Sequence, residues 1–139
     1  MAAATLKESV EIFQKKYPDV EVKVEDFGSG DLYEKLTVGL AARGSGLPDV
    51  VLMEDERIPG YTHQFPQGFL PLNKLGYDKY KDSFNPAKVA AVQDKDGNMI
   101  AAPWLLSHCI RHCSLVGMLH NSRTIKSYAP KEAKINLYL

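Results

Sequence analysis

The chain has 139 residues, of which 45% are hydrophobic and 24% are charged, and its formal net charge is zero. This length fits one domain, and the composition is that of a globular protein rather than a disordered or fibrous one. The neutral charge balance argues against a general affinity for nucleic acid or for an anionic membrane. No apolar run approaches the roughly 20 residues of a membrane-spanning helix, and the start of the chain lacks the pattern of an export signal.

The first part of the chain alternates helical and extended patterns. Residues 5–17 begin with a capping box and repeat apolar side chains at helical spacing, which predicts a helix. Residues 20–25 alternate valine with charged side chains and predict a strand. Residues 31–43, opened by a capping aspartate, predict a second helix, and the apolar run at residues 49–53 predicts a strand covered on both faces. This order of elements indicates an α/β fold.

The segments that follow predict shorter elements. Pro59 can begin a short helix, and residues 77–84 and 86–93 are compatible with short surface helices. The sequence DKDGN at residues 94–98 predicts a turn. The sequence MIAAPW at residues 99–104 then predicts an extended segment that ends at a proline and a tryptophan.

Four charged residues stand directly after the strand predicted at residues 49–53, namely Glu54, Asp55, Glu56 and Arg57. In a parallel α/β sheet the ligand crevice lies beyond the carboxyl ends of the strands. Carboxylates accept hydrogen bonds from ligand hydroxyls and a guanidinium donates in a planar fork, so this set suits a polyhydroxylated ligand. The alternative, of equal weight, is a group of solvated surface ion pairs worth about 0 to 1 kcal/mol each.

Trp104 is the single tryptophan of the chain and ends the extended segment after Pro103. A flat aromatic face is a natural platform for the apolar side of a sugar ring. A lone tryptophan is more often a core residue, but its position at the end of an extended segment weakens that preference. Trp104 is therefore a second candidate for ligand binding.

The composition changes after Trp104. Residues 1–104 hold 16 of the 17 acidic residues, whereas residues 105–139 hold one acid, five bases and three of the four histidines. Potential zinc ligands cluster in this second segment at His108, Cys109, His112 and Cys113. Their spacing matches neither a CxxC zinc knuckle nor a CxxCH haem motif, so an accidental cluster is favoured and no metal site is predicted.

The sequence contains no glycine-rich phosphate loop, nucleophile elbow or catalytic triad motif. We therefore expect neither an enzyme nor a bound cofactor. We therefore look for a binding function.

Three segments carry a resemblance to a known family: TLKESVEIFQKKYPDVEVKVEDFG, DLYEKLTVGLAARGSGLPDVVLMEDERIPGY and DKDGNMIAAPW. In this order and spacing, residues 2–104 resemble the extracellular solute-binding proteins of carbohydrate ABC transporters, of the maltodextrin-binding type. The resemblance implies an incomplete lobe of a class II periplasmic-binding-protein-like fold, with a mostly parallel sheet flanked by helices. It also implies an extracellular or periplasmic protein, often a lipoprotein, that hands an oligosaccharide to a membrane permease.

The resemblance also implies roles for particular residues. In that family an acidic residue followed by arginine, after the third strand, faces the cleft between two lobes and contacts sugar hydroxyls. Glu56 and Arg57 match this pair, Asp55 is adjacent to it, and Trp104 matches an aromatic residue at the cleft. These four residues are therefore the expected ligand-binding residues.

The sequence departs from the family at both ends. The family's central first strand would precede the first helix and is missing here, so residues 20–25 and 49–53 are expected to lack their common neighbour. Residues 115–120, or another copy of the chain, are candidates to fill that gap. We expect a partial amino-terminal lobe over residues 1–104 and a divergent or frameshifted tail over residues 105–139.

Two functions remain open at this point. The first is the carbohydrate-binding component of an ABC transporter, present as a fragment with impaired binding and marginal stability. The alternative is a small interaction or metal-binding protein that acts through its tail with histidine and cysteine.

Overall fold

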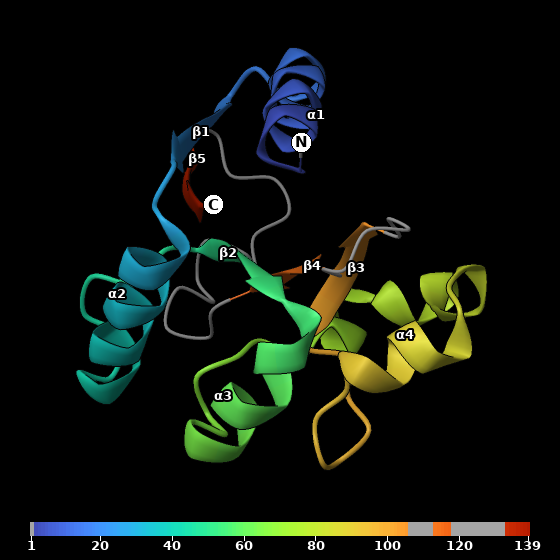
Figure 1. Ribbon diagram of the computed structural model, residues 1–139. Coiled ribbons are helices and arrows are strands. Elements are labelled where there is room, and N and C mark those ends of the chain that lie inside the picture. The colour runs from blue at the N-terminus through green and yellow to red at the C-terminus, as the bar shows by residue number, and fades with distance from the viewer. Residues whose placement is uncertain (1, 106–112, 118–132) are drawn as a thin grey trace.

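The computed structural model describes residues 2–105, 113–117 and 133–139 (Figure 1). The helices and strands in chain order are α1 (Ala2–Lys16), β1 (Val20–Glu25), α2 (Ser29–Ala41), β2 (Val50–Glu54), α3 (Ile58–Gln64), α4 (Pro86–Ala91), β3 (Ala101–Leu105), β4 (Cys113–Gly117) and β5 (Ala133–Tyr138). Three short 3₁₀ helices are η1 (Asp55–Arg57), η2 (Leu72–Leu75) and η3 (Tyr77–Ser83). Within the described residues, no helix has both the length and the apolar character needed to cross a bilayer.

The sequence patterns locate the first elements to within a few residues. α1 begins at Ala2, so Thr5 lies inside the helix and the predicted capping box is wrong. α2 begins at Ser29 with Gly28 as its N-cap, and Asp31 lies in the first turn, where its negative charge stabilises the helix dipole. The predicted helix at residues 77–84 is the 3₁₀ helix η3. The sequence patterns therefore locate these elements but not their first residues.

The turn predicted at residues 94–98 is confirmed. The Asp94 Oδ1 atom accepts hydrogen bonds from the backbone amides of Asp96 and Asn98, at 2.9 and 2.8 Å. Gly97 has a φ angle of 79°, which glycine adopts without the steric cost that a side chain would carry. The turn leads through Met99, which bridges to Gln93, into β3.

The five strands of the described residues form one sheet in the order β1-β5-β2-β4-β3. β5 runs parallel to β1 and to β2, whereas β4 runs antiparallel to β2 and to β3. Because β2 and β3 are both antiparallel to β4, they point the same way as β1 and β5. β2 and β3 also end at the same level, beside Cys113 of β4, and we name this end of the sheet the carboxyl edge. β1 and β5 end further back, where Tyr138 lies beside Val51 near the start of β2. The fold is α/β, as predicted.

The space between β1 and β2 is filled by β5, which comes last in the chain (Figure 1). β5 is in register with the whole of β1, and Val22 pairs with Ile135. The prediction that β1 and β2 would lack a common neighbour is therefore wrong. Of the other candidate, residues 115–120, the described residues 115–117 lie in β4 on the far side of β2, and the rest lie outside the described residues. The boundary after Trp104 stays a prediction, although two strands beyond it belong to this same sheet.

The sheet is covered on both faces, as the alternating side chains of β2 show. Val51 and Met53 are 0% and 1% exposed and lie in the larger core, with apolar residues of α2, α3 and α4. Val50 and Leu52 point to the other face and pack with Leu6 of α1. The prediction that this strand is covered on both sides is confirmed. Packing on both faces holds the residues at its carboxyl end in place.

Candidate functional site

The turn η1, which holds Asp55, Glu56 and Arg57, and the backbone of Trp104 both lie at the carboxyl edge. Glu54 at the end of β2 and Leu105 at the end of β3 both lie opposite Cys113 of β4 in the strand register. Neighbouring strands are about 4.8 Å apart, so the ends of β2 and β3 are about 10 Å apart. The backbone of Trp104 therefore lies on the same edge as the 3₁₀ turn η1, across one intervening strand.

The turn η1 connects β2 to α3 without a loop. Ile58, the first residue of α3, is buried in the larger core, so the far end of the turn is fixed by packing. Pro59 follows in the first turn of the helix, where its missing amide hydrogen costs nothing. Within η1 the side chains of Glu56 and Arg57 are exposed and that of Asp55 is buried.

Arg57 is held in place by two neighbours. Its Nε atom donates a hydrogen bond of 3.0 Å to Oε2 of Glu54, and its guanidinium lies 4.2 Å from the centre of the Tyr33 ring. The hydrogen bond to Glu54 is the main cause that raises the pKa of Arg57, so the group keeps its charge. With Nε engaged, the terminal nitrogens of the fork still carry hydrogens that can be donated to a ligand.

Glu56 lies between these anchored neighbours. Its side chain is exposed and forms no hydrogen bond or ion pair with any residue that the structure describes. A carboxylate in this state has all its lone pairs available for hydroxyl donors. Among the three residues of η1, Glu56 is therefore best suited to accept hydrogen bonds from a ligand.

Asp55 points into the protein. Its carboxylate forms an ion pair with the ammonium group of Lys88 in α4, and the two side chains are only 9% and 4% exposed. The surface ion pair that the sequence allowed as an alternative thus fits Glu54 with Arg57, but not Asp55. The sequence patterns did not predict a role for Lys88. Its position one helical turn before the buried Val92 was the signal that could have placed it on the inner face of the helix.

Tyr33 in α2 also supports the site and was missed by the sequence patterns. Its hydroxyl accepts a hydrogen bond of 3.1 Å from the backbone amide of Glu54. Its carbonyl oxygen accepts from the hydroxyls of Thr37, at 2.7 Å, and of Tyr61, at 3.1 Å. These bonds join α2 and α3 beneath the end of β2, so the Tyr33 ring is a fixed surface for Arg57.

The candidate metal ligands His108, Cys109 and His112 lie outside the described residues. Cys113 begins β4, and its backbone lies between the ends of β2 and β3. Within the part of the chain that the structure describes, no group of three histidine, cysteine, aspartate or glutamate residues could hold a metal ion.

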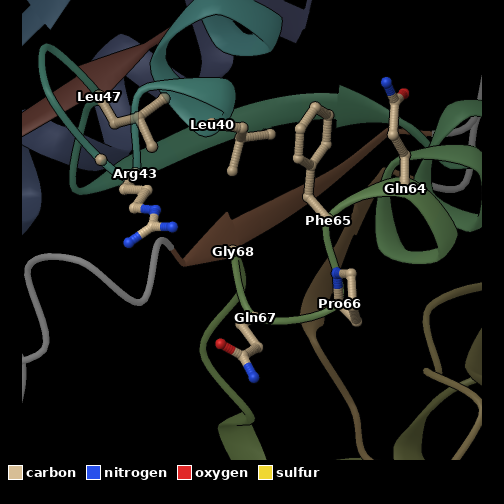
Figure 2. A pocket seen from close by; sticks show the side chains of 9 residues that line it. Leu40, Arg43, Leu47, Gln64, Phe65, Pro66, Gln67 and Gly68 are labelled. Atoms are coloured by element: carbon tan, nitrogen blue, oxygen red, sulfur yellow. The ribbon is translucent and has the colours of Figure 1, made fainter.

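The structure also contains a separate pocket of about 640 Å³ (Figure 2). Its lining comes from the end of α2, the segment before β2 and the end of α3, and consists of Leu40, Arg43, Gly44, Leu47, Gln64, Phe65, Pro66, Gln67 and Gly68. Leu47 precedes the first residue of β2, so the pocket lies toward the opposite end of that strand from Glu54. None of the predicted ligand-binding residues lines it.

Comparison with known proteins gives two matches. The family model described as "Bacterial extracellular solute-binding protein" matches residues 2–107. The lactose-binding protein of Rhizobium radiobacter is 39% identical over 83 residues, an alignment that covers 56% of this chain and 20% of that protein. No solved structure matches the chain. The chain thus spans about a fifth of the length of the curated relative that it matches.

The family match covers the elements α1 to β3, which include η1 and Trp104. It therefore extends over the residues that the structure places at the carboxyl edge. The chain belongs to the family of bacterial extracellular solute-binding proteins.

Proposed function

We propose that the chain forms part of the sugar-binding lobe of an ABC transporter's solute-binding protein. One observation carries this proposal: Glu56, Arg57 and the backbone of Trp104 lie at one edge of the sheet, although Trp104 is distant from η1 in the sequence. The name of the lactose-binding relative supports a sugar as the ligand. A ligand of one or a few sugar units also matches the span of about 10 Å between the two strand ends.

The proposed contacts follow from the chemistry of each group. Glu56 accepts hydrogen bonds from sugar hydroxyls, and Arg57 donates to sugar oxygens from the terminal nitrogens of its guanidinium. For Trp104 we propose the role that the family resemblance implies, an aromatic platform for the apolar side of a sugar ring. For Asp55 we propose a supporting role without direct contact to the sugar, because its carboxylate is buried and paired with Lys88.

As one lobe of a two-lobed protein, the chain would cover only one side of the sugar. Ligand pockets bury most of the surface of their ligand, and a two-lobed protein does so by closing on both sides. A single lobe leaves one face of the sugar in water, so we propose that this chain binds sugars weakly. In the complete protein the lobe works outside the cytoplasm and passes its ligand to a membrane permease.

The proposal can be tested by titrating the isotopically labelled chain with lactose and with maltotriose while recording the amide resonances. We expect shifts at residues 54–57 and 102–105, and no shifts at residues 64–68 beside the separate pocket. Lactose is tested because of the relative, and maltotriose because of the resemblance to maltodextrin-binding proteins. Shifts confined to residues 64–68, or none with either sugar, would contradict the proposed site.

A further inference from the structure

We propose that Lys88 is a positioning residue of the sugar site, which it serves by fixing the turn η1 through its ion pair with Asp55. This inference rests on the proposed function. It assigns to Lys88 and Asp55 an indirect role, because neither side chain has the exposure that contact with a sugar requires. The residue whose position would depend on this ion pair is Glu56, the next in the chain after Asp55.

The ion pair joins two parts of the fold that are distant in the sequence. Asp55 and Lys88 are separated by 33 residues, and their side chains are 9% and 4% exposed. Lys88 lies on the inner side of α4 beside Val89, which is part of the larger core. The core therefore fixes the helix that carries Lys88, and the ion pair transmits this fixed position to η1.

Removal of either charge breaks this buried ion pair. A buried ion that has lost its partner is strongly unfavourable, because its lost hydration is no longer compensated. Loss of the ion pair removes the tie between η1 and α4, and a movement of η1 toward solvent would hydrate the Asp55 carboxylate. Such a movement carries Glu56 with it, since the two residues share a turn of only three residues.

The other end of η1 has its own support. Arg57 bonds to Glu54 at 3.0 Å and lies over Tyr33, so it does not depend on Lys88 directly. Loss of the ion pair should therefore affect Glu56 more than Arg57. This asymmetry separates a positioning role from general destabilisation, which would affect both ends of the turn.

The experiment compares Lys88→Met, which removes the charge and keeps an unbranched side chain, with Val92→Ala, which opens the core beside α4. Both variants should lower the melting temperature, but we expect only Lys88→Met to weaken lactose binding, by about tenfold, the lower end of the range for residues that orient metal ligands. In the free protein, the amide resonances of residues 55–56 should move in Lys88→Met and stay in place in Val92→Ala.

A double-mutant cycle with Glu56→Gln gives a readout that a purely structural role would not change. If Lys88 acts through Glu56, Lys88→Met should weaken binding much less in the Glu56→Gln background than in the wild type. Additive losses, or a tenfold loss in Val92→Ala as well, would overturn the inference. If Lys88→Met does not fold, Asp55→Asn/Lys88→Met removes both charges and must show the same dependence on Glu56.

The proposed function and this inference fail in different ways. If the wild type binds lactose and Glu56→Gln weakens binding, while Lys88→Met binds as the wild type does, the inference alone is overturned. If the wild type shows no shifts with lactose or maltotriose, both are overturned. Unchanged resonances of residues 55–56 in Lys88→Met would overturn the inference without any ligand.

Discussion

The backbone amide of Asn136, in β5, donates a hydrogen bond of 2.7 Å to the buried carboxylate of Asp49, which directly precedes β2. The amide of Asp49 in turn donates to the carbonyl oxygen of Asn136 at 2.9 Å. These bonds connect residues that are 87 positions apart and fix β5 beside β2. The middle of the sheet thus depends on a strand from the end of the chain.

The first prediction concerns this connection. Asp49→Ala should lower the free energy of unfolding by about 1.5 to 3 kcal/mol, the range for hydrogen bonds to a charged group. Chemical denaturation measures this change. Asp19→Ala, at an exposed position before β1, is the matched control and should change stability by less than about 0.5 kcal/mol. Equal effects of the two substitutions would show that β5 is not held by Asp49.

A second prediction tests the burial of β5. Leu137 is 5% exposed in the smaller core with Leu6. Leu137→Ala should cost about 2 to 5 kcal/mol, because it removes buried apolar contacts and leaves a cavity. The control is Ile12→Ala, since Ile12 is 68% exposed on α1. If amide exchange showed β5 to be as unprotected as a frayed terminus, the position of β5 between β1 and β2 would be refuted.

A third prediction concerns pH. Partial burial alone would raise the pKa of Asp94, but the hydrogen bonds from Asn98 and from the amide of Asp96 outweigh it and lower that pKa. A lowered pKa means that Asp94 stabilises the fold above the pKa of the unfolded state, about 3.9, and that this contribution disappears as the pH falls through the folded value.

Thermal melts of the wild type and Asp94→Asn at several pH values test this sign. The wild type should be the more stable protein at pH 7, and the difference should shrink as the pH falls below about 4. Asp96→Asn, at an exposed position of the same turn, should show no such convergence. A difference between wild type and Asp94→Asn that stayed constant with pH would contradict the role of these hydrogen bonds.

A fourth prediction concerns the support of Arg57. Arg57→Lys keeps the positive charge but loses the planar fork and the stacking on Tyr33, so it should weaken lactose binding. The loss should exceed that for Lys79→Gln, because Lys79 lies in η3 and outside the proposed site. Binding that is equal in the two variants would show that charge alone matters at this position.

Some of this structure could be predicted because the information is local. Two strands follow from local patterns alone: the alternating valines predict the strand at residues 20–25, and the apolar run predicts the strand at residues 49–53. The position of the charged residues after the second of these strands was enough to propose a site. Those inferences needed neighbours in the sequence only.

Other features depend on contacts that no local pattern contains. The sequence of β5 gives no sign that it lies between β1 and β2, because that position is set by pairing with residues far away in the chain. In the sequence Asp55 does not differ from its charged neighbours, because its partner Lys88 lies 33 residues later. The same holds for Tyr33, whose hydroxyl and ring meet Glu54 and Arg57 only in the folded chain.

The central claim is that the chain binds a sugar at the carboxyl edge through Glu56. It is tested most directly by titrating the wild type, Glu56→Gln and Glu11→Gln with lactose. Glu11 is an exposed glutamate of α1 and has no part in the proposed site. We predict weak binding by the wild type and by Glu11→Gln, and binding about tenfold weaker or more by Glu56→Gln, as for loss of a charged hydrogen-bond partner. Equal affinities of the two variants would contradict the claim.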